Sequence, residues 1–191
     1  MPPRLVLFTR YPTPGEAKTR LIPALGPDGA AALHRRLTER TLSTLRHAGL
    51  PIELRVTGGD RMAFAAWLGN DLTIIDQGEG DLGMRLARAV EPAPVIFVGA
   101  DAPDLRPDHL RQAAELLASA PVVIGPAEDG GYWLLGLGRA ILEIFDDMPW
   151  GTAGVLAETE GRLRVLGIRA ERLETLADID RPEDLARWPD L

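Results

Sequence analysis

Short apolar runs alternate with amphipathic segments along most of the chain, and this alternation constrains the fold more than any other feature of the sequence. The continuous apolar run at residues 94–98 is typical of a strand that is buried on both faces of a sheet. Strands that alternate with helices form a mostly parallel sheet with helices on both faces. We therefore expect an α/β fold, a three-layer α/β/α sandwich around a mostly parallel sheet, in a single domain spanning residues 1–191.

Apolar periodicity, together with the prolines and glycines that interrupt it, gives the bounds of the expected elements. Strands are expected at residues 5–8, 52–57, 72–75, 94–98, 122–124, 132–135 and 163–168. Helices are expected at residues 27–47, 61–68, 82–90, 107–117, 141–145, 153–160 and 182–188. Only a loop separates the fifth and sixth strands, so one strand in that part of the sheet should run antiparallel.

Composition excludes several classes of protein. The chain has no cysteine, which excludes a disulfide scaffold, thiol catalysis, cysteine-ligated zinc and iron–sulfur clusters. A net charge of −7 with scattered arginines argues against nucleic-acid binding, which needs a concentrated basic stripe. The apolar run at residues 5–8 is too short for a signal peptide or a membrane span, so we expect a soluble, cytoplasmic protein.

Polar and glycine-rich segments follow several of the expected strands, at the rim where open α/β sheets bind their ligands. The first such segment, residues 9–20, holds Arg10, Lys18 and Arg20 around Gly15. Glycine allows close backbone approach and the cations neutralise oxyanions, so the loop suits a phosphate-bearing ligand, although a solvated basic loop is an equally good interpretation. Lys18 is also the one lysine among 21 basic residues, a bias that a GC-rich coding sequence would produce.

The segment after the third expected strand carries the pattern Gly78-x-Gly80-x-x-Gly83, which has the spacing of a dinucleotide-binding fingerprint. That pattern would indicate a nicotinamide-dependent oxidoreductase. However, Glu79 and Asp81 would bring negative charge to a pyrophosphate. The nicotinamide hypothesis therefore stays a minor alternative.

Asp101 is the best candidate for a metal ligand, because it follows a buried strand directly and lies between Gly99 and Pro103. Mg²⁺ prefers one or two carboxylates together with substrate phosphates. Asp178 or Asp180 could supply the second carboxylate if the sheet brings the last loop alongside. For Asp180 the residues alone favour a different role, as the N-cap of the helix that follows it.

Asp129 is a candidate for proton transfer, since it lies on a glycine-rich turn before an aromatic strand. It could act as a general base toward a substrate hydroxyl, and an ordinary turn residue is an equally good interpretation. His34, His47 and His109 share no metal-ligand spacing, and no serine lies in a nucleophile elbow, so a triad hydrolase is excluded.

Several segments together resemble a bacterial family labelled radical-SAM/selenodomain-associated transferase 1, a glycosyltransferase-like group of the nucleotide-diphospho-sugar transferase superfamily. The segments are residues 8–21, 80–83, 99–105, 125–132 and 178–185. The resemblance implies a GT-A-type fold, with a Rossmann-like, mostly parallel sheet that binds a nucleotide phosphate with a divalent metal. The chain is also similar to the guanylyltransferases of cofactor synthesis, although Arg10-Tyr11-Pro12 replaces the glycine pair that usually opens their first loop.

This resemblance implies roles for particular residues. The nucleotide-binding set would be Thr9, Arg10, Gly15, Lys18, Arg20, Gly80 and Asp81. The metal, Mg²⁺ or Mn²⁺, would bind Asp101 with Asp178 or Asp180. We expect the catalytic residues to be Lys18 and Asp101, together with Asp129 at the acceptor hydroxyl. The expected activity is transfer from a nucleotide-sugar donor to a small-molecule acceptor. Nucleotidyl transfer from a nucleoside triphosphate and non-catalytic nucleotide binding are the alternatives.

Overall fold

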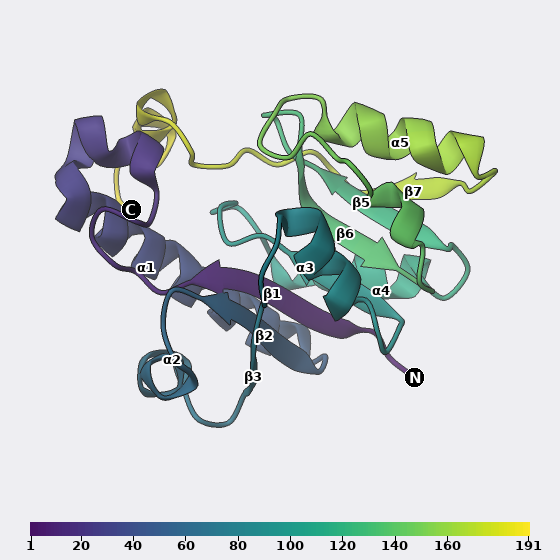
Figure 1. Cartoon of the computed structure of the whole chain (residues 1–191), viewed down its shortest axis with the longest axis horizontal. Helices are drawn as coiled ribbons and strands as arrows, with labels where there is room; N and C mark the ends of the chain where they lie inside the picture. Colours follow the sequence, from purple (N-terminus) through teal and green to yellow (C-terminus); the bar gives the residue numbers. More distant parts are fainter.

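The computed structural model describes all 191 residues and contains one seven-stranded sheet (Figure 1). Its strands are β1 (Arg4–Arg10), β2 (Ile52–Thr57), β3 (Thr73–Asp76), β4 (Val95–Val98), β5 (Val122–Pro126), β6 (Tyr132–Leu137) and β7 (Ala170–Arg172). Their order across the sheet is β3-β2-β1-β4-β6-β5-β7. Only β6 runs antiparallel to its neighbours, which confirms both the mostly parallel sheet and the reversal predicted between the fifth and sixth strands.

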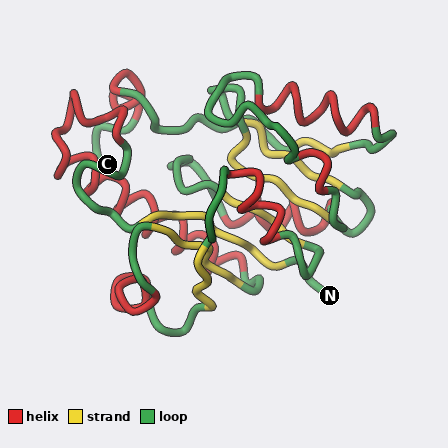
Figure 2. The backbone as a smooth tube through the Cα atoms, viewed as in Figure 1, coloured by secondary structure: helices red, strands yellow, loops and turns green.

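Helices cover both faces of this sheet (Figure 2), so the predicted three-layer α/β fold is confirmed. They are α1 (Ile22–Ala48), α2 (Arg61–Leu68), α3 (Leu82–Ala89), α4 (Pro107–Leu116) and α5 (Val155–Val165), with the 3₁₀ helices η1 (Thr19–Leu21), η2 (Leu142–Ile144) and η3 (Pro182–Arg187). One hydrophobic cluster joins the sheet to α1, α2 and α4, and another joins the opposite face to α3, η2 and α5. None of the helices has the length and apolar character that crossing a bilayer requires.

Side chains of the central strand β1 point alternately to the two faces of the sheet, so one sheet supports two core layers. On β1, Leu5 and Leu7 belong to the cluster under α1, whereas Val6 between them belongs to the cluster under α3. All three side chains are fully buried. The central strand is therefore packed on both faces, and the loop at its carboxyl end begins from this buried core.

The C-terminal segment crosses the rim of the sheet and packs beside α1 (Figure 1). After β7 the chain follows β5, where the Leu176 N–H donates to the Pro126 carbonyl at 3.1 Å. Ile179 is fully buried against Leu21 and Leu33. The last loop is therefore fixed across the ends of β5, β4 and β1.

The strand predicted at residues 163–168 is wrong, because this stretch completes α5 and then turns. Leu163 faces the core, but Val165 is 88% exposed on the helix surface, so the apolar run did not mark a buried strand. Gly167, with φ +68°, ends the helix, and the short edge strand β7 follows it. The long helix also begins earlier than predicted, with a break at Gly26 directly before Pro27.

Candidate functional site

Buried side chains anchor the loop after β1 to the hydrophobic core. Ala17 and Leu21 are fully buried, and Tyr11 packs edge-on against Phe64 at 5.4 Å between ring centroids. Lys18 lies between these anchors with φ +49°, in the left-handed region that residues other than glycine rarely adopt. This backbone conformation is consistent with a constrained functional position.

Lys18 joins the three segments in which phosphate-binding and metal-binding residues were predicted. Its side chain is only 6% exposed, and its Nζ lies 2.8 Å from Asp101 Oδ1 and 4.0 Å from Asp180 Oδ1. The same ammonium donates a hydrogen bond to the carbonyl of Ile179. Because little water reaches this ammonium, its pairing with Asp101 is screened less than a surface ion pair would be.

A cavity of about 300 Å³ lies beside this loop, and we call it the cationic cavity. Its lining residues are Arg10, Glu16, Lys18, Thr19, Arg20, His34, Asp101 and Asp180. The guanidinium of Arg10 donates to the Glu16 carbonyl at 2.8 Å, and that of Arg20 pairs with the Asp180 carboxylate. The three predicted phosphate-binding cations thus lie around one cavity.

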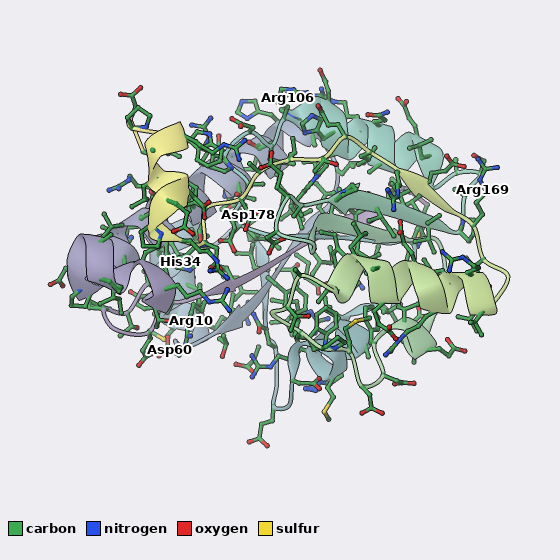
Figure 3. The ribbon with its side chains drawn as sticks, turned by 90° about the horizontal axis from the view of Figure 1, so that it is seen from above. Arg10, His34, Asp60, Arg106, Arg169 and Asp178 are labelled. Carbon is green, nitrogen blue, oxygen red and sulfur yellow. The ribbon has the colours of Figure 1, made fainter.

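His34, which the sequence did not single out, reaches this cavity from α1. Its Nε2 lies 3.0 Å from the Arg10 carbonyl, and burial lowers the pKa of its imidazole. Figure 3 shows Arg10, His34 and Asp178 in the same half of the molecule, far from Arg169. A neutral imidazole can support the loop without adding charge, and no local pattern around His34 would have identified it.

A second cavity, of about 190 Å³, contains three carboxylates, and we call it the acidic cavity. Asp101, Asp129 and Asp178 line it together with apolar and aromatic side chains. Burial raises the pKa of Asp178 to about 6, and the nearby carboxylates of Asp129 and Asp101 add to the effect. These acidic groups come from three different loops and line the same cavity.

The donor set of the acidic cavity fits a divalent cation that completes its coordination with phosphate oxygens. No three His, Cys, Asp or Glu side chains lie close enough to hold a metal by themselves. Mg²⁺ commonly uses only one or two carboxylates plus substrate phosphates, and Asp101 and Asp178 can supply these. Asp180 fits less well than Asp178 as the second ligand, because its carboxylate is already paired with the Arg20 guanidinium.

The interpretation of Asp180 as a helix cap is wrong. The N-cap of η3 is Arg181, and Asp184 in the first turn completes the cap, since its Oδ2 accepts from the backbone N–H of Asp180 at 3.0 Å and of Arg181 at 2.7 Å. The side chain of Asp180 is thereby left to line the cationic cavity. The sequence did not distinguish these two aspartates, because both lie near the start of η3.

The turn that carries Asp129 is fixed by packing against the segment before α5. Gly130 has φ +89°, and a Cβ there would lie 2.1 Å from the carbonyl oxygen of Ala153, so only glycine fits. The Leu156 N–H donates to the Gly130 carbonyl at 2.9 Å. Asp129 Oδ1 accepts from the Gly131 N–H at 2.8 Å, which holds the carboxylate at the edge of the acidic cavity.

The remaining predicted nucleotide-binding residues lie outside the two polar cavities. The hydroxyl of Thr9 is buried, 3.2 Å from that of Thr38 on α1, so this side chain supports the loop from behind. Gly15 lies at the exposed tip of the first loop with φ +83°. Thr9 and Gly15 can therefore shape the loop, but neither offers a side chain to a ligand in the cationic cavity.

The glycine pattern at residues 78–83 makes hydrogen bonds within the protein itself. Asp81 caps the helix by accepting from the Met84 N–H at 2.8 Å, and Arg85 donates to the Gly80 carbonyl at 2.9 Å. The N-terminus of α3 is thus already occupied by a carboxylate of the same chain. This arrangement weakens the dinucleotide-binding interpretation.

The sequence profile of the DUF2064 family, described as an uncharacterized protein conserved in bacteria, matches residues 41–152. None of the curated proteins matches the chain. A crystal structure from Desulfovibrio desulfuricans G20, provisionally assigned as a nucleotide-diphospho-sugar transferase, is 31% identical with a TM-score of 0.87. That match covers 93% of this chain and 82% of the other.

Two more distant structures share the fold. A nucleotidyl transferase from Methanothermobacter thermautotrophicus has a TM-score of 0.64 at 21% identity, covering 97% of this chain and 95% of the other. Glucosyl-3-phosphoglycerate synthase from Mycobacterium tuberculosis, in complex with Mn²⁺, UDP and glucosyl-3-phosphoglycerate, has a TM-score of 0.58 at 12% identity. That match covers 96% of this chain and 74% of the other. The architecture is therefore of the GT-A type, as the resemblance implied.

Proposed function

The chain belongs to the DUF2064 family, and we propose that it is a metal-dependent transferase that moves a sugar from a nucleoside diphosphate to a small acceptor. One observation carries this proposal: the cationic and acidic cavities meet at Asp101, which lines both and pairs with Lys18. A donor diphosphate in the first cavity would then place its sugar toward the second. Within the family, we propose membership of the radical-SAM/selenodomain-associated transferase 1 group.

In this proposal the cations of the first loop bind the donor. Arg10, Lys18 and Arg20 neutralise the diphosphate and stabilise the charge that grows on it as it leaves. Asp101 and Asp178 would hold Mg²⁺ or Mn²⁺, which supplies further positive charge at the phosphate oxygens. Lys18 must then exchange part of its pairing with Asp101 for the phosphate, and its place in the lining of the cationic cavity suits that exchange.

Asp129 takes the proton of the acceptor hydroxyl. One of its oxygens is held by the Gly131 N–H, which leaves the other for the acceptor. The acceptor oxygen forms a bond to the anomeric carbon, and the bond from that carbon to the diphosphate oxygen breaks. The electron pair stays on the leaving diphosphate, and the proton passes from Asp129 to water.

Nucleotidyl transfer is the second candidate, and the number of cations around the first cavity favours it. Three basic side chains would suit the larger charge of a nucleoside triphosphate. In that reaction a phosphate or hydroxyl oxygen of the acceptor bonds to the α-phosphorus, and pyrophosphate leaves. The likeness to the Methanothermobacter enzyme supports the fold of such an enzyme and not its reaction.

A thermal-shift screen separates the candidates. Nucleoside diphosphates, their sugar conjugates, nucleoside triphosphates and NAD(P) are each tested with and without Mg²⁺ or Mn²⁺. Metal-dependent stabilisation by diphosphates and their sugars supports sugar transfer, whereas stabilisation by triphosphates alone supports nucleotidyl transfer. Binding without product across a broad acceptor panel would indicate a non-catalytic nucleotide-binding protein. Stabilisation by NAD(P) alone would contradict the whole proposal.

A further inference from the structure

An apolar cavity of about 120 Å³ lies between the sheet and α3, beside the acidic cavity. Ten of its eleven lining residues are hydrophobic. Phe8 and Phe97 come from β1 and β4, and Leu86 comes from α3. This lining is almost wholly apolar and offers few hydrogen-bonding partners to a sugar ring or a polyol, so the donor chemistry leaves this cavity unexplained.

The apolar cavity adjoins the acidic cavity. Five residues line both of them, and these are Leu82, Gly99, Tyr132, Trp133 and Trp150. A ligand that fills the apolar cavity can therefore extend toward the carboxylates at Asp101 and Asp129. The apolar cavity contains no residue of the cationic cavity, so it lies on the acceptor side of the proposed site.

We propose that the apolar cavity binds an aryl or short alkyl group of the acceptor, whose hydroxyl reaches Asp129. The acceptor is then an amphiphilic alcohol or phenol rather than a polyol or a second sugar. This inference rests on the proposed transferase function. Its volume of about 120 Å³ is of the same order as that of a dry cavity of about 150 Å³, lined by similar side chains, that can bind benzene.

The two tryptophans at the junction differ in how they are held. The Trp133 indole donates to the Glu174 carbonyl at 3.2 Å and packs on the ring of His109, so its position is fixed. The Trp150 indole N–H is buried without a hydrogen-bond partner. No side-chain hydrogen bond holds the Trp150 indole, so the position of this ring depends on packing, including that against Phe145 at 6.5 Å between ring centroids.

The test uses benzyl alcohol as the apolar probe and glycerol as its polar counterpart, with binding to the full chain measured by ligand-observed NMR. Leu86→Trp should fill the apolar cavity from α3. The matched control is Leu68→Trp, the same substitution at a leucine of α2. Leu68 lines a different cavity and belongs to the hydrophobic cluster on the opposite face of the sheet from Leu86. Circular dichroism checks folding, and Leu86→Phe replaces Leu86→Trp if the larger change prevents it.

We expect native protein and Leu68→Trp to bind benzyl alcohol at least about 10-fold more tightly than either binds glycerol, and Leu86→Trp to lose this preference. Equal binding of benzyl alcohol by native protein and Leu86→Trp would overturn the inference.

Metal-dependent stabilisation by the donor is measured on the same samples. If the donor stabilises all three proteins but all three bind benzyl alcohol equally, the inference is contradicted and the proposed transferase function is not. If Leu86→Trp no longer binds benzyl alcohol preferentially but no nucleotide stabilises any of the three proteins, the apolar binding site is supported and the proposed transferase function is contradicted.

Discussion

The cationic and acidic cavities share Asp101 but balance their charges in opposite ways. Around the cationic cavity every basic side chain has an acidic partner within the chain. These pairs are Arg10–Glu16, Lys18–Asp101 and Arg20–Asp180. In the acidic cavity, Asp129 and Asp178 have no such partner, and the pKa of Asp178 is raised. In the cationic cavity, a phosphate could therefore replace the carboxylates that now pair with the basic side chains. In the acidic cavity, a metal ion could supply the positive charge that Asp129 and Asp178 lack.

The largest effect is expected on turnover when a carboxylate of the acidic cavity is neutralised. Asp129→Asn should lower kcat by at least about 100-fold, because it removes the base, while the donor Kd stays within about 2-fold. Product formation with the donor found by thermal shift provides the measurement. The matched control is Glu128→Gln, since Glu128 is adjacent but paired with Arg187 at 2.6 Å. A kcat within about 3-fold of native for Asp129→Asn would remove this residue from the mechanism.

Lys18→Arg tests whether the cationic cavity needs a compact cation. The Lys18 ammonium is 6% exposed and lies between the Asp101 carboxylate and the Ile179 carbonyl, a space that a planar guanidinium would crowd. We expect nucleoside diphosphates to bind about 10-fold more weakly, as measured by titration calorimetry. Arg20→Lys, at an arginine that is 55% exposed, should change the Kd by less than about 3-fold. Full activity of Lys18→Arg would mean that the lone lysine is an accident of composition.

The smallest effect concerns the stability of the metal-free protein. The folded-state pKa of Asp178, about 6, lies above its ordinary value of 3.8, so the fold favours the protonated acid. Its stabilising contribution is complete below pH 3.8 and is lost as the pH rises through 6. Asp178→Asn should therefore raise the free energy of unfolding at pH 8 by about 1 kcal/mol, a value discounted for solvent access to the half-buried group.

Denaturant unfolding in chelator at pH 4 and pH 8 measures this difference, which should vanish at the lower pH. Asp190→Asn, at an exposed position near the C-terminus, provides the control and should change stability at neither pH. A variant that is no more stable than native protein at pH 8 would show that the acidic cavity is not electrostatically strained.

The sequence predicted those features of the fold that depend on local patterns. Residues 52–57 and 61–68 form a strand and a helix with the predicted bounds, because apolar periodicity and the Asp60 cap define them locally. The strand expected at residues 163–168 failed because apolar residues on the exposed face of α5 imitate a strand. Periodicity records side-chain type and not burial, so it could not distinguish the two.

The candidate site was only partly accessible to sequence reasoning. Asp101 was identified because it follows a buried strand, and the prediction that the last loop could lie alongside agrees with the bond from the Ile179 N–H to the Asp101 carbonyl at 2.9 Å. The pairing of Lys18 with Asp101 depends on segments more than 80 residues apart in the chain. Likewise, His34 reaches the site only because α1 packs behind the first loop. Contacts of this kind arise from tertiary packing and leave no local signature.

The central claim is that Asp101 couples metal to nucleotide, and Mn²⁺ titration monitored by electron paramagnetic resonance tests it most directly. Native protein and Asp101→Asn are each titrated with Mn²⁺, with and without a nucleoside diphosphate. The account predicts that the nucleotide tightens Mn²⁺ binding to native protein at least about 10-fold and that Asp101→Asn abolishes this effect. If Asp101→Asn bound the nucleotide with the same Mn²⁺ dependence as native protein, the account would be contradicted.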